Sequence, residues 1–93
     1  MSGVSLEAQI RCLEEMISYL SAYCSDMNDC IDDYYRNLVA LREKGLTLEF
    51  GELYEREYYL PAKSRLEQVI GDIQYGHLRF LSEILERMKA MRD

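Results

Sequence analysis

Residues 6–41 read LEAQIRCLEEMISYLSAYCSDMNDCIDDYYRNLVAL. In this stretch, apolar residues recur at alternating steps of four and three without a break. They are Leu6, Ile10, Leu13, Ile17, Leu20, Cys24, Met27, Ile31, Tyr34, Leu38 and Leu41. A sustained 3.5-residue period is typical of a helix that keeps one seam against a neighbouring helix along its length. The sequence therefore predicts one long helix with a continuous packing surface.

The ends of this helix are marked by its flanking residues. Ser5 is a suitable N-cap, and Glu7 in the first turn suits the positive end of the helix dipole. Gly45 can take the left-handed conformation that ends a helix. We therefore expect the first helix over about residues 5–43 and a turn at 44–47. So short a connection favours an antiparallel helical hairpin.

A second helix is expected over about residues 48–91. Phe50, Leu53, Tyr54 and Tyr58 follow a helical spacing before Pro61. Proline lacks a backbone N–H, and its ring clashes with the carbonyl four residues earlier. Pro61 therefore either kinks a continuous helix or starts a separate segment as its first helical residue.

After Pro61 the second helix carries two apolar stripes. The first is formed by Leu66, Ile70, Ile73, His77, Phe80 and Ile84, and the second by Leu78, Leu81, Leu85 and Met88. The first helix can cover only one of them, so we expect the second stripe to meet a partner. The chain is thus predicted to be a single all-α hairpin domain, residues 1–93, that completes a four-helix bundle with a partner.

Two further groups are candidates for the partner interface. Met16, Tyr23 and Cys30 widen the apolar stripe of the first helix on one flank. Tyr54 and Tyr58 are expected to cluster with Tyr34 and Tyr35 near the turn, either as core packing or as part of a partner-binding patch, because tyrosine is favoured at interface hot spots.

Composition excludes several classes of function. The net charge is −6 with scattered basic residues, which disfavours nucleic-acid and anionic-membrane surfaces. The N-terminus lacks the basic and apolar regions of a signal peptide, and no segment has the apolar length of a membrane span. We expect a cytoplasmic protein with free thiols at Cys12, Cys24 and Cys30, or one exported by a leaderless route.

Catalytic and metal-binding patterns are missing. Asp26, Asp29, Asp32 and Asp33 form an acidic run, which we interpret as a solvated helix face because no Glu-x-x-His motif accompanies it. His77, the single histidine, falls on the first stripe and is interpreted as a packed residue. We expect no enzyme activity, no metal and no cofactor.

The chain resembles the small helical-hairpin proteins of type VII secretion, the Trp-x-Gly family and its relatives that accompany LXG toxins. Gly45 is followed by the aromatic Phe50, and Pro61 by the apolar residues Leu66, Val69, Ile70 and Ile73, as in that family. Two features depart from it. Glu43 stands where the family has its tryptophan, and Tyr75 is followed four residues later by Arg79 instead of the acidic residue of the family's secretion signal.

The resemblance implies a non-catalytic partner or chaperone that dimerises or binds a helical targeting domain of the kind LXG toxins carry. The alternative is a phage- or toxin-related helical regulator or inhibitor that binds a basic protein surface through its acidic faces.

Overall fold

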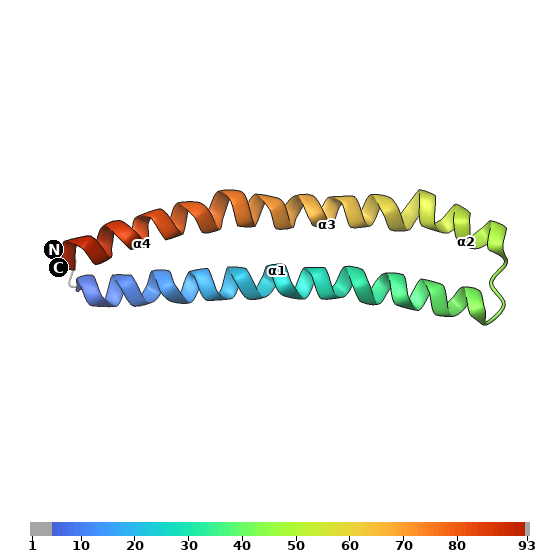
Figure 1. The fold of residues 1–93 in the computed structure, drawn as a ribbon, viewed down its shortest axis with the longest axis horizontal. Helices are drawn as coiled ribbons and strands as arrows, with labels where there is room; N and C mark the ends of the chain where they lie inside the picture. The colour runs from blue at the N-terminus through green and yellow to red at the C-terminus, as the bar shows by residue number, and fades with distance from the viewer. Residues whose placement is uncertain (1–4, 93) are drawn as a thin grey trace. The chain divides into compact units, whose positions relative to one another are not determined.

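The computed structural model describes residues 5–92, and all of their regular structure is helical. Helix α1 spans Leu6–Glu43, and a short connection leads to α2 at Leu48–Tyr54 (Figure 1). The chain continues through a π-helical turn η1 (Glu55–Tyr59), α3 (Leu60–Asp72), a second π-helical turn η2 (Ile73–His77) and α4 (Leu78–Arg92). No non-helical residue separates α2 from α4, so the second arm is continuous and does not divide at Pro61.

Local hydrogen bonds define the start of both arms and the connection between them. The Ser5 hydroxyl accepts from the Ala8 N–H at 3.1 Å, and the Thr47 hydroxyl accepts from the Phe50 N–H at 3.2 Å. Gly45 has a φ of 125°, a conformation that residues with a Cβ rarely adopt. These contacts satisfy backbone groups that helix ends leave unpaired.

The chain forms two compact units, which are described separately. The terminal unit comprises residues 5–24 and 71–92, and the turn unit comprises residues 25–70. Within the terminal unit, the start of α1 lies beside the end of α4 (Figure 1), and Arg92 pairs with Glu7 at 3.4 Å.

The seam of α1 is confirmed over nearly all of its predicted length. Every predicted member from Leu6 to Leu38 is buried or half-buried. The exception is Leu41, which is 55% exposed, while the next residue, Arg42, is half-buried in its place. The apolar seam therefore ends one turn before the helix does.

In the turn unit, the second arm changes its inward face at η1. Tyr59 is buried, whereas Tyr58 is exposed. Before η1, the inward tyrosine of the second arm is Tyr54, which is half-buried. It lies five positions from Tyr59, one more than the four of an α-helical turn. Because Pro61 cannot pack its ring against the Glu57 carbonyl in an α-helical turn, the wider π-helical turn before it relieves the clash. The extra residue moves the inward face by one position.

In the terminal unit, η2 causes the same shift and brings the second predicted stripe inward, while Ile73 and Ile84 of the first stripe are also half-buried. The inward row passes from Ile73 to Leu78, again a step of five. Leu85 is then buried, and the other members of the second stripe, Leu78, Leu81 and Met88, are half-buried. His77 and Phe80, predicted for the seam, are exposed. The prediction that the second stripe faces away from α1 is therefore wrong, because spacing alone does not reveal a π-helical turn.

Deleting one residue tests this account of η2. Removal of Tyr75, which is 79% exposed inside η2, shortens the turn to α-helical spacing and keeps Leu78 and Leu85 facing inward. We expect the free energy of unfolding to change by less than about 1 kcal/mol. Removal of exposed Ser82, after the turn, rotates Leu85 out of the core and is expected to lose about 2–4 kcal/mol.

Urea unfolding followed by far-UV circular dichroism measures both deletions. Equal losses for the two variants would contradict the assignment of the inward row.

Candidate partner-binding surface

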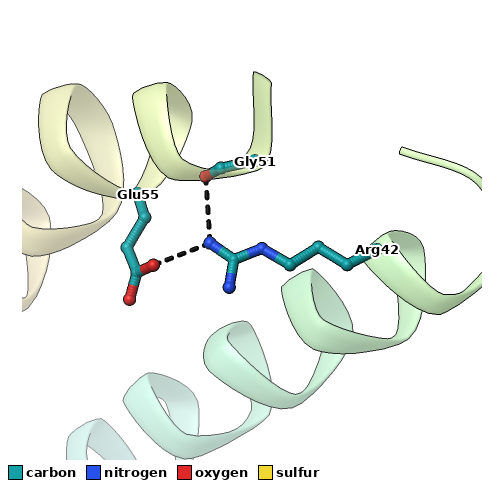
Figure 2. Close-up of polar contacts among 3 residues, drawn as sticks. All are labelled: Arg42, Gly51 and Glu55. Atoms are coloured by element: carbon teal, nitrogen blue, oxygen red, sulfur yellow. Dashed lines mark hydrogen bonds and ion pairs between the residues drawn. The ribbon is translucent and has the colours of Figure 1, made fainter. Parts of the chain in front are cut away.

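The inward position next to the turn is filled by an arginine. The Arg42 guanidinium donates from Nη2 to the Gly51 carbonyl at 3.0 Å and to Glu55 Oε2 at 2.7 Å (Figure 2). The side chains of Arg42 and Glu55 are 22% and 25% exposed, so solvent screens this ion pair less than a surface pair. We call this set of contacts the Arg42 bridge. It joins α1 to both α2 and η1 within the turn unit.

Gly51 makes the Arg42 bridge sterically possible. Gly51 is buried, and a Cβ built on it would lie 2.7 Å from Arg42 Nε and 3.3 Å from Arg42 Cγ. Any larger residue would therefore force the arginine side chain to shift from this position. The glycine is required here for close approach, since its backbone stays in a regular helix.

Apolar side chains around the Arg42 bridge point outward. Leu41, Leu48, Phe50 and Leu53 are all exposed, and Gly51 is the buried residue of α2. Two of them, Leu41 and Phe50, border a groove of about 280 Å³, which we call the turn groove. It is lined by Tyr34, Asn37, Leu38, Leu41, Leu46, Phe50 and Tyr54.

The predicted tyrosine cluster forms beside this groove. The Tyr34 and Tyr54 hydroxyls are hydrogen-bonded at 2.6 Å, and the Tyr34 and Tyr59 rings meet edge to face at 5.0 Å. Tyr54 also stacks on the exposed ring of Tyr58 at 5.3 Å. The hydrogen bond to Tyr54, together with burial, raises the pKa of the Tyr34 hydroxyl. Both hydroxyls have a partner, so the groove presents mainly ring surface.

The turn unit has a second, more polar groove of about 450 Å³. Its charged side chains are Asp32, Arg36, Glu55 and Lys63, and buried Tyr59 forms part of its wall. Two carboxylates and two cations of this kind favour polar recognition. The groove contains no nucleophile–base pair of the kind that covalent catalysis uses.

The terminal unit carries an apolar groove of about 400 Å³, which we call the terminal groove. Met16 and Leu20 line it from α1, and His77, Phe80 and Leu81 line it from the second arm. Met16 and Phe80 are about half exposed at its edges. The histidine therefore lies beside a surface groove and not in the seam where the sequence placed it.

The predicted interface residues fall into two groups. Met16, Tyr23, Cys30 and Tyr58 are exposed, and Tyr54 is half-buried. Leu78, Leu81, Leu85 and Met88 belong to the hairpin's own core, as described above. Sequence reasoning missed Arg42, Gly51 and Glu55. The one signal that the sequence offered for this contact is a glycine, Gly51, inside a predicted helix and close to the basic residue Arg42 across the turn.

Other chemical features of the described residues are sparse. Within residues 5–92, no group of three or more His, Cys, Asp or Glu side chains is placed to hold a metal ion. The acidic run from Asp26 to Asp33 is exposed, and Asp33 pairs with Arg36 at 3.1 Å. The thiols of Cys12, Cys24 and Cys30 are free, and only that of Cys24 is buried.

Comparison with protein-family models, curated proteins and solved structures gave no match to this chain. No helix within residues 5–92 has the length and apolar character needed to cross a membrane.

A glycine pair tests the Arg42 bridge. Gly71→Ala meets open space and should gain about 0.5–1 kcal/mol of stability from helix propensity. Gly51→Ala has the same propensity gain but displaces Arg42 from two acceptors, so we expect a net loss of about 1–2 kcal/mol. Urea unfolding measures both values. A Gly51→Ala variant as stable as Gly71→Ala would show that the bridge contributes nothing.

Proposed function

We propose that this chain is a non-catalytic interaction module that binds a helical protein partner. The observation that carries the proposal is the apolar surface that the described residues expose. Fourteen large hydrophobic side chains among residues 5–92 are exposed, against seven hydrophobic residues that are buried.

The placement of these exposed side chains supports the same proposal. Four of them line a groove: Leu41 and Phe50 line the turn groove, and Met16 and Phe80 line the terminal groove. Apolar surface of this kind marks protein interaction sites.

The biological setting that we propose is type VII secretion. A two-armed helical hairpin agrees with the resemblance to the small partner proteins that accompany LXG toxins. The missing tryptophan and secretion signal favour the role of a partner or chaperone that binds a helical targeting domain, or that dimerises. The secretion signal would then be carried by the partner.

A second candidate function is inhibition of a protein with a basic surface. Residues 25–70 contain ten acidic and six basic residues, a net charge of −4 out of −6 for the chain. Such a concentration of charge favours association with a basic partner. The two candidates differ in what holds the complex together, apolar contact or charge.

Light scattering after size-exclusion chromatography tests the proposal. We expect the purified chain to form a dimer, or to form a stoichiometric complex when co-expressed with the helical products of neighbouring genes. A helical chain that stays monomeric at about 0.5 mM and binds none of those products would contradict it.

Salt dependence then separates the two candidates. A helical partner held by apolar contact should remain bound when ionic strength rises from about 0.1 M to 1 M. Loss of the complex over that range would favour the inhibitor.

A further inference from the structure

At the end of the turn unit next to the turn, a polar side chain faces inward and apolar side chains face solvent. The heptad of α1 places Leu41 in the seam, yet Leu41 is exposed and the inward position is filled by Arg42. Phe50 of α2 is likewise 53% exposed. A helix end that turns its apolar residues to solvent gives up burial worth about 1.5–3 kcal/mol per side chain. A complex that covers those side chains would recover this free energy of burial.

The Arg42 bridge stabilises this arrangement, with the arginine inward and Leu41 and Phe50 exposed. Arg42 spans the space between the arms and reaches the Gly51 carbonyl and Glu55 (Figure 2). Because Gly51 has no side chain, the arginine takes the volume that an apolar contact would need. The outward position of Leu41 and Phe50 is therefore built into the unit by its own polar contacts.

The turn groove between these side chains has the dimensions of a side-chain site. Its volume of about 280 Å³ lies just below the range of about 300–1,000 Å³ that is usual for small-molecule pockets. Leu38, which is buried, forms part of its lining, and the hydroxyls of Tyr34 and Tyr54 satisfy each other. The groove therefore offers an apolar and aromatic surface to one or two bulky side chains.

Charge around the turn groove points to the chemistry of the occupant. Glu43, Glu49 and Glu52 are exposed, and Glu49 lines a small hollow together with Phe50. Arg42 is neutralised by Glu55, which leaves Lys44 as the exposed cation of this segment. This excess of negative charge favours a bound segment that carries lysine or arginine next to the apolar side chain that enters the groove.

We propose that the turn groove is the docking site for an amphipathic helix of a protein partner. A bulky apolar side chain of that helix enters between Leu41 and Phe50, and its flanking lysine or arginine residues pair with Glu49 and Glu52. This inference rests on the proposed function, since it assigns the surface through which a helical protein binds.

Selection from a phage-displayed library of helical peptides on the full chain tests this assignment. The two phenylalanines of the chain supply matched variants, because Phe50 and Phe80 are 53% and 54% exposed and line different grooves. Peptides enriched on the wild-type chain are synthesised, and their affinity for Phe50→Ala and Phe80→Ala is measured by fluorescence anisotropy. Circular dichroism confirms that both variants keep their helix content.

We expect the enriched peptides to be amphipathic and rich in lysine or arginine. Phe50→Ala should weaken them at least about tenfold, and Phe80→Ala less than about twofold. Peptides that lose affinity only for Phe80→Ala would overturn the inference and leave the proposed function standing. Enrichment of acidic peptides would also overturn it.

Two other occupants appear as distinct outcomes. Self-association that Phe50→Ala abolishes would put a second copy of the chain in the groove. Binding to phosphatidylcholine–phosphatidylglycerol vesicles that Phe50→Ala abolishes would put a lipid surface there. Either result overturns docking of a partner helix, and enrichment of no peptide would count against both this inference and the proposed function.

Discussion

The Arg42 bridge decides which side chains the turn unit shows to a partner. The inward side chain of Arg42 is held by the Gly51 carbonyl and the Glu55 carboxylate. Gly51 has no side chain, so the arginine has space to reach both acceptors. The half-buried position of this cation is tolerated because its charge is paired with Glu55 and Nη2 is hydrogen-bonded. With that position taken, Leu41 and Phe50 are left outside the packed seam, and the turn groove follows from their placement.

A second constraint acts along the rest of the hairpin. The strict 3.5-residue row of α1 requires a facing row on the second arm, but the apolar residues of that arm change phase twice. Each change coincides with a π-helical turn, which adds one residue and restores the inward row. The arm thereby buries Tyr59 before α3 and Leu85 in α4, although no single helical period connects them.

The sequence alone was sufficient for the helical class, the turn glycine and the α1 seam, because these depend on local spacing and on backbone conformation at Gly45. It was insufficient for the second arm. Two stripes one residue apart fit a helix equally well. Whether His77 and Phe80 or Leu78 and Leu81 face α1 depends on the π-helical turn η2, which the spacing of the residues does not reveal. Leu41 was also misplaced, because the heptad continues through it while the Arg42 bridge, a contact across the turn, overrides the pattern.

The most direct test of the central claim is the solvent exposure of individual leucine methyl groups. Methyl NMR of the full chain with a soluble gadolinium chelate measures this exposure through paramagnetic relaxation. We predict strong relaxation at Leu41 and Leu53 and protection at Leu38, which is 4% exposed. Protection of Leu41 equal to that of Leu38 would contradict the account, because the seam would then continue to the turn and Arg42 would not hold the inward position.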